Sequence, residues 1–292
     1  MKNDRKNYNI QNRKHRNREW IPFLLPGLAG VSIFVLLPFL DVVRRSFFTA
    51  LGGNFVGIDN YMTIFHNQAF CLAMKNTLHF LGICLPLLVI LSLVMAVMLS
   101  RAVYRERLKA MFLFPMAVPT AAVVVIWKMF FYRQGLLNGL LDKCGITGPD
   151  WLGSSYAFYV LVASYLWKNL GYTIVLWLTG ILQISDGLYE AARMDGARED
   201  QIFFWIILPN LRNTFYMVVI LSFVNSFKVF REAYLVAGSY PDESMYMMQH
   251  LFNNWFTNLD LDKMAAAAVV VTLLLVSVVI LLEGIVWRKC KK

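Results

Sequence analysis

Several charged and amide side chains lie inside long apolar segments of this chain, together with aromatic rings. An ionisable side chain deep in a membrane is costly and normally faces a protein interior or a water-filled cavity. At ~1.5 Å of rise per residue, Lys168 and Lys228 would lie roughly 20 Å along their helices. Rings that cover the C–H faces of a sugar, with amides for its hydroxyls, are the usual chemistry of a carbohydrate pocket. We therefore expect a substrate path lined by Trp167, Lys168, Asn169, Asn225, Phe227, Lys228, Arg231 and Tyr234.

Other roles are open to members of this set. Glu232 follows Lys228 by one helical turn, so these two side chains can form an internal ion pair with a purely structural role. Arg231 and Tyr234 can belong instead to an outer gate. The excess of basic over acidic groups in the region also permits an anionic solute, such as a phosphorylated or uronic compound.

Catalytic and metal-binding patterns are absent from the sequence. The four histidines are scattered, without an HExxH, GxSxG or paired-acid arrangement, and the four cysteines show no CxxC spacing. No G-x-x-x-x-G-K-[ST] phosphate loop occurs. We therefore expect no enzyme activity, no metal site and no cofactor in this chain.

Composition indicates an all-α, polytopic membrane protein. The 292 residues are 58% hydrophobic and 16% charged, with a mean hydropathy of +0.54, whereas ~25% charged residues is typical of soluble domains. Six segments are long and apolar enough to span a membrane. They are Trp20–Val43, Thr77–Leu99, Ala110–Phe131, Tyr156–Leu182, Asn213–Val236 and Met264–Val286. We expect kinks at the prolines inside three of them, Pro22, Pro26, Pro38, Pro86, Pro115 and Pro119.

The distribution of lysine and arginine predicts the orientation in the membrane. Eighteen basic residues fall on the side of the termini and eight on the other side, which places both termini in the cytoplasm. The net charge of +10 lies in these flanks, so it indicates membrane topology and no nucleic-acid partner. Residues 1–19 are interpreted as a retained basic tail. The external connections carry rings and amides, among them Asn254 and Trp255, which predict a surface for a partner or lipid, or an interfacial aromatic belt.

A charged stretch, Glu190–Pro209, interrupts the apolar runs on the cytoplasmic side. We expect one helix that starts at Ser185 or Asp186 and ends before Gly196, because glycine adopts a left-handed backbone at little cost. We expect a second helix from near Asp195 through Phe203–Ile207 that stops at Pro209. Physically, the stretch is either a docking surface or an amphipathic connector that rests on lipid.

The spacing of this stretch carries a resemblance to a known family. Glu190-Ala191-Ala192, three residues, Gly196, nine residues and Ile206-x-Leu208-Pro209 resemble the "EAA" loop in permease subunits of binding-protein-dependent ABC importers. The resemblance implies that this loop docks in a cleft of a cytoplasmic ATPase. The implied coupling residues are Glu190, Ala191, Ala192, Asp195, Gly196, Ile206, Leu208 and Pro209.

Further motifs are similar to the maltose and glycerol-phosphate type of these permeases. They are Gly57-Ile58-Asp59-Asn60-Tyr61, Asn76-Thr77, Asp195-Gly196-Ala197 and Tyr234–Gly238. The chain departs from the usual Gly-Gly-Pro after the fifth segment, because it has Ala237-Gly238-Ser239-Tyr240-Pro241 there.

The resemblance implies a type I ABC importer transmembrane fold in a bacterial cytoplasmic membrane. Its implied parts are a tail at 1–19, a first span and loop at 20–75, a transport core at 76–286 with the coupling loop at 183–212, and a basic end at 287–292. Implied partners are a second permease, two ATPase subunits that bind ATP and Mg, an external solute-binding protein and membrane lipid. The implied cargo is an oligosaccharide, or an anionic sugar derivative or glycerol phosphate. From another class, the alternative is an ion-coupled secondary transporter.

Overall fold

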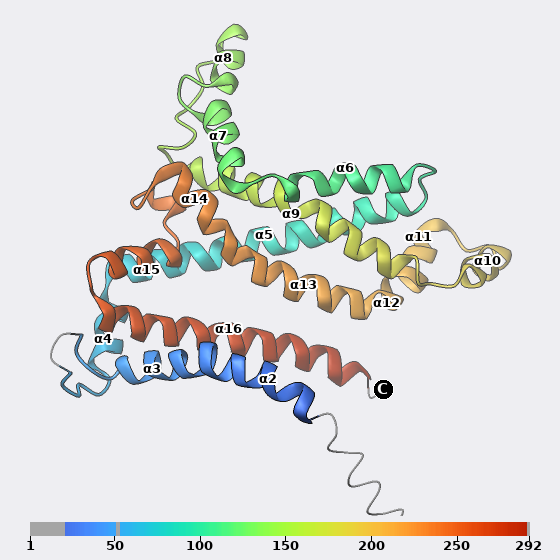
Figure 1. Cartoon of the computed structure of the whole chain (residues 1–292). Coiled ribbons are helices and arrows are strands. Elements are labelled where there is room, and N and C mark those ends of the chain that lie inside the picture. Colours follow the sequence, from blue (N-terminus) through green and yellow to red (C-terminus); the bar gives the residue numbers. More distant parts are fainter. Residues whose placement is uncertain (1–20, 51–52, 291–292) are drawn as a thin grey trace, which may run out of the picture. The chain divides into compact units, whose positions relative to one another are not determined.

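A computed structural model describes residues 21–50 and 53–290, and every named element in that part is a helix. The tail at 1–19 and the last two residues of the basic end lie outside the described residues. The all-α prediction is therefore confirmed for the described residues. Outside the helices, one isolated β-bridge joins Phe48 and Phe55. In order (Figure 1), the helices are α2 (Ile21–Val31), η1 (Ser32–Leu36), α3 (Leu37–Arg45), α4 (Asp59–His66), α5 (Gln68–Ser100), α6 (Arg105–Ala117), α7 (Thr120–Phe131), α8 (Leu136–Lys143), α9 (Ala157–Ile181), α10 (Asp186–Met194), α11 (Glu199–Ile202), η2 (Phe203–Ile207), α12 (Leu208–Asn210), α13 (Arg212–Ser226), η3 (Phe227–Val229), α14 (Phe230–Ala237), η4 (Glu243–Met245), α15 (Met248–Thr257) and α16 (Leu261–Cys290).

Four helical stretches of the described part are long and apolar enough to cross a membrane. They are Pro22–Arg45, Gln68–Ser100, Arg212–Ala237 and Leu261–Gly284. A fifth is added if α6 and the α7–α8 rod count as one broken span. The predicted fourth segment is α9, a single helix of 25 residues. The count of six spans stays a prediction.

The third apolar segment is not the single helix that we expected over Ala110–Phe131. It breaks between α6 and α7, and the two rods meet at an angle of 89°. Val118 at the break is extended (φ −72°, ψ 127°) because Pro119 follows it. Proline disfavours helical backbone in the residue before it and has no N–H to donate. In Figure 1, α7 and α8 accordingly turn away from the line of α6. Pro26, Pro86 and Pro115 lie inside continuous helices.

The described chain forms two compact units. The first contains residues up to 64 and residues 259–272; the second contains residues 65–258 and the chain from 273 onward. In the first unit, the amide of Asn60 donates to the carbonyl oxygens of Ser46 and Phe48, at 3.0 Å each. Tyr61 and Ser46 share a hydroxyl hydrogen bond of 2.7 Å. The Gly57–Tyr61 motif therefore closes the loop between α3 and α4.

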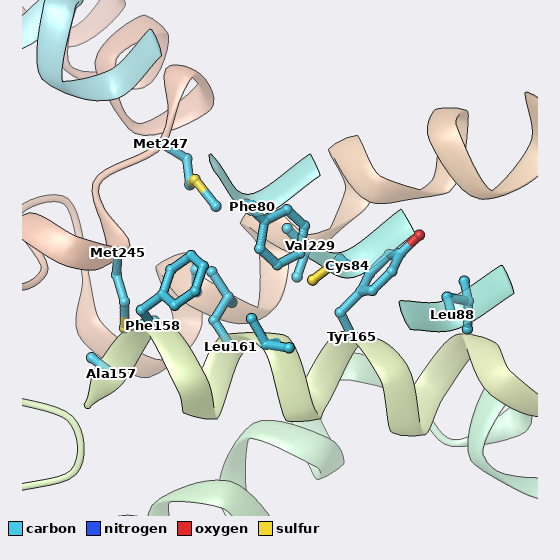
Figure 2. Packing of buried hydrophobic residues seen from close by; sticks show 12 residues of the cluster. Phe80, Cys84, Leu88, Ala157, Phe158, Leu161, Tyr165, Val229, Met245 and Met247 are labelled. Atoms are coloured by element: carbon cyan, nitrogen blue, oxygen red, sulfur yellow. The ribbon is translucent and has the colours of Figure 1, made fainter. Parts of the chain in front are cut away.

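The second unit is built around α5, α9 and α13, which pack against one another. Figure 2 shows one of its two apolar clusters, in which Phe158 and Tyr165 of α9 lie near Phe80 and Cys84 of α5. Met247, which precedes α15, contributes to the same cluster. Burial of these side chains supplies the main driving force for packing.

Glycine brings α6 and α9 unusually close. A Cβ atom at Gly171 would overlap the carbonyl oxygen of Phe112, so only glycine fits at this crossing. The result is a close contact between α9 and α6, the helix that precedes the break.

The segment after α14 folds back onto the N-terminal part of α5. The amide of Asn76 donates to the carbonyl oxygens of Glu243 and Tyr246, at 2.5 and 3.0 Å. The hydroxyl of Thr77 accepts from the backbone N–H of Met248 at 3.1 Å. Asn254 and Trp255 of α15 are buried, so the prediction that they form an exposed surface is wrong. The helix that carries them, α15, packs against α5 instead.

Candidate functional site

A cavity of about 180 Å³ lies between α7, α9 and the stretch from α13 to α14. Eight of its ten lining residues are polar or charged. The lining residues are Met116, Thr120, Ser164, Tyr165, Lys168, Asn169, Asn225, Val229, Arg231 and Glu232. Two structural breaks border it, since Thr120 opens α7 directly after the 89° bend and Val229 ends the short 3₁₀ turn η3.

An ion pair across three helices organises this cavity. The ammonium group of Lys168 on α9 lies against the carboxylate of Glu232 on α14 and donates to the hydroxyl of Thr120 on α7 at 3.0 Å. Only 6% of the Glu232 side chain and 23% of the Lys168 side chain are exposed. The sequence suggested Lys228 as the partner of Glu232. The structure shows that Glu232 pairs with Lys168.

Four residues of the predicted substrate path line the cavity, namely Lys168, Asn169, Asn225 and Arg231. Three others pack elsewhere. Trp167 makes an edge contact with Trp127, Phe227 with Phe223, and Tyr234 lies against Phe230. Lys228 lies in η3, and its side chain is outside the part that the structure describes.

The cavity also contains residues that sequence reasoning did not place there. Thr120, Ser164 and Tyr165 are small or aromatic hydroxyl residues within apolar runs, and hydropathy gives them no special weight. A helical spacing of four joins Ser164 to Lys168 on one face of α9, which was the available signal. Tyr165 donates its hydroxyl to the carbonyl of Ser222 at 2.8 Å and thereby ties α9 to α13.

The charged stretch Glu190–Pro209 contains a complete glycine cap at the end of its first helix. Helix α10 closes with a hydrogen bond of 2.9 Å from the N–H of Ala197 to the carbonyl of Ala192, and one of 3.1 Å from Gly196 to Arg193. This pair is the Schellman arrangement. Gly196 has φ +77°, as predicted for a left-handed turn. Ser185 occupies the N-cap position without a side-chain cap.

The predicted coupling residues divide between an outer and an inner face. Glu190, Ala191, Asp195 and Gly196 are exposed. Ala192 and Ile206 pack against the second apolar cluster, which includes Ile181 and Leu211. Leu208 and Pro209 are exposed beyond it.

The second helix of the loop differs from the expectation at both ends. It begins at Glu199, because the N–H of Arg198 is capped by the Gln201 side chain at 2.8 Å. It then continues through the π-helical turn η2 into α12, so the prediction that Pro209 stops it is wrong. Pro209 lies just after the π-helical turn η2, inside the continuing helix.

Charged groups connect this loop to the end of α5. Glu199 accepts from Arg101 at 2.5 Å and from Arg193 at 3.4 Å, beside an open groove of about 700 Å³. Burial raises the pKa of Tyr189 in this groove, and the carboxylate of Asp186 adds to the rise. Among the described residues, no three His, Cys, Asp or Glu side chains are grouped to hold a metal ion.

Known proteins share this architecture. A family model described as "Binding-protein-dependent transport system inner membrane component" matches residues 88–292. The osmoprotective compounds uptake permease protein GgtC of Synechocystis sp. is 30% identical, over 79% of this chain and 87% of its own length. The trehalose/maltose transport system permease protein MalF of Thermococcus litoralis is 31% identical, over 80% of this chain and 81% of its own length.

Two other similar proteins are named for the transport of an anionic compound. The sn-glycerol-3-phosphate transport system permease protein UgpA of Yersinia pestis is 27% identical, over 93% of this chain and 96% of its own length. A crystal structure of a bacterial ABC transporter that imports the acidic polysaccharide alginate superposes with a TM-score of 0.82. That match covers 95% of this chain and 99% of the other at 22% identity, which shows a common fold.

Proposed function

Because this chain belongs to the family of binding-protein-dependent transport system inner membrane components, we propose that it carries a carbohydrate through the membrane. It does so as one of two permeases of an ATP-driven importer. The observation that carries the proposal is the exposed α10 face, with Glu190 and Ala191, held by the Gly196 cap. ATP and Mg are bound by partner ATPase subunits and not by this chain.

The proposed mechanism is alternating access driven through the cytoplasmic loop. Closure of the ATPase pair moves α10, and the inward-facing Ala192 and Ile206 pass that movement to the apolar cluster below. That cluster includes Ile174 and Trp177 of α9, and α9 also carries Lys168 of the cavity. One rigid helix therefore connects the loop to the proposed substrate path, with both termini of the chain in the cytoplasm.

The proposed cargo contacts the cavity wall. Support comes from its amides, Asn169 and Asn225, and from the hydroxyls of Thr120 and Ser164, which match the hydroxyls of a sugar. A sugar phosphate or uronic acid is the second candidate, because the exposed guanidinium of Arg231 also lines the cavity.

Affinity purification tests the assignment directly. A tagged chain should co-purify a second permease of the same family and two ATPase subunits, and a loaded binding protein should stimulate ATP hydrolysis. Ala191→Arg places a long charged side chain on the exposed face and should lose the ATPase. Lys143→Ala, on α8, should retain it. Purification of the unaltered chain without any ATPase would overturn the proposal.

A further inference from the structure

We infer that the cavity selects an uncharged, hydroxyl-rich part of the solute, and that Glu232 makes this selection. The inference rests on the proposed transport function and goes beyond it, since it separates neutral sugars from anionic ones. Glu232 would accept a hydrogen bond from a solute hydroxyl and, because it compensates Lys168, leave a solute anion without a free counter-charge on the inner wall.

Glu232 has an unused acceptor in a buried place. Its residue is 5% exposed, and its Oε1 atom is engaged by Lys168. Its Oε2 atom is buried and has no hydrogen-bond partner among the described residues. A buried carboxylate oxygen without a donor is unfavourable. A ligand that donates a hydrogen bond to Oε2 of Glu232 would therefore be favoured at this wall.

Ser164 supplies a second unused polar atom on the same wall. Its Oγ atom is buried without a partner among the described residues, and both Ser164 and Glu232 line the cavity. A serine hydroxyl both donates and accepts. The hydroxyls of a sugar do the same and can therefore satisfy both Ser164 and Glu232. A carboxylate or phosphate dianion can only accept and leaves Oε2 unsatisfied.

The arrangement of charge in the cavity favours the same class of ligand. Lys168 is compensated by its direct contact with Glu232, so it is not free to neutralise an incoming anion without breaking the pair. Arg231 is exposed, and water and salt screen its attraction more than they screen the buried carboxylate. An anion that reaches the inner wall therefore gains no net attraction from the Lys168–Glu232 pair, and its oxygens cannot donate a hydrogen bond to Oε2 of Glu232.

The volume of the cavity limits how much of the solute its residues can contact at once. About 180 Å³ is small beside the ~300–1,000 Å³ of pockets for drug-sized ligands. One sugar ring can occupy it at a time, so the selection applies to single units of a longer chain.

The test measures binding to the complete transporter in nanodiscs, without its binding protein. Neutral probes are trehalose, maltose and lactose; anionic probes are glycerol 3-phosphate and glucuronate. In the unaltered protein, the best neutral probe should bind at least tenfold more tightly than either anion. Glu232→Gln should reduce that preference at least tenfold, because it removes the charged acceptor and frees Lys168 to attract an anion.

Two further variants make the result interpretable. Lys168→Gln combined with Glu232→Gln leaves no buried unpaired charge, and it should also lose the preference, even if Glu232→Gln alone does not assemble. Glu243→Gln removes a carboxylate from the exposed external segment and should keep the preference.

Tighter binding of an anion than of every neutral probe would overturn the inference, as would an unchanged preference in the double variant or a lack of binding by all neutral probes. ATP hydrolysis and subunit composition of the same preparation test the proposed function separately.

Discussion

Lys168 and Glu232 lie 64 residues apart in the chain, and their side chains meet between α9 and α14. The pair is largely buried, and Lys168 is also bonded to Thr120 at the start of α7. Two charges buried in this way offset each other, whereas either one alone is costly. The pair therefore holds three helices around the proposed substrate path.

Removal of one member should therefore destabilise the protein more than removal of both. Lys168→Met leaves the Glu232 carboxylate buried without its cation, at a cost of about 3 kcal/mol. Lys168→Met combined with Glu232→Leu should recover much of the loss. Thermal unfolding of the purified complex measures both. Equal midpoints for the single and the double variant would show that the pair is not coupled.

The backbone at Gly196 should control coupling to the ATPase. A Cβ atom there meets nothing within 4 Å, but φ is +77°. Any effect therefore comes from backbone strain, which costs about 1–2 kcal/mol for an L-residue in this region. Gly196→Val should reduce ATPase assembly and binding-protein-stimulated hydrolysis, whereas Gly196→Asn should be milder because asparagine tolerates this backbone. Wild-type hydrolysis in the valine variant would argue against the coupling role.

The crossing of α6 and α9 should be intolerant of a single methyl group. Gly171→Ala forces the added Cβ against the backbone carbonyl of Phe112, so the helices must separate. We expect a lower unfolding midpoint and loss of transport. Gly82→Ala on α5 is the matched control, since nothing lies within 4 Å of its Cβ position. It should be neutral or stabilising by up to ~1 kcal/mol. Similar behaviour of the two variants would refute the close crossing.

Stability should fall in mildly acidic solution because of His250. Burial lowers the pKa of His250 to about 4 from its ordinary 6.5, and its Nδ1 atom accepts from the N–H of Met247 at 3.2 Å. Between these two pH values the unfolded chain binds a proton that the folded chain does not, so the free energy of unfolding decreases as the pH falls. Below about pH 4 the loss from this group is complete.

The variant His250→Gln isolates this contribution. It cannot titrate, so the difference in unfolding midpoint between it and the unaltered protein should shrink as the pH is lowered from 6.5 to 4. A difference that is constant over this range would contradict a neutral, buried His250.

Local patterns predicted the elements of this fold better than their contacts. Hydrophobic runs located the helices, and the glycine cap at Gly196 followed from the conformational freedom of one residue. The break at Val118–Pro119 was underestimated, because a proline near the middle of an apolar run is compatible with a kink or with a full break. Whether the helix kinks or breaks depends on the helices that pack against it, and their positions cannot be read from the sequence.

The candidate site shows the same limit. A spacing of four suggested Lys228 as the partner of Glu232, whereas the partner that the structure shows lies on a different helix. Thr120 carried no sequence signal, and Ser164 carried only its spacing of four from Lys168, because hydroxyl residues are common in apolar helices and often bond their own backbone. Their significance depends on the cavity that they line.

The most direct test of the account is solute uptake by proteoliposomes that contain the complete transporter. ATP is enclosed inside, the loaded binding protein is added outside, and ion gradients are collapsed with ionophores. The account predicts uptake that requires internal ATP and the binding protein and continues without any ion gradient. Uptake that needs no ATP and stops when the gradients collapse would contradict it.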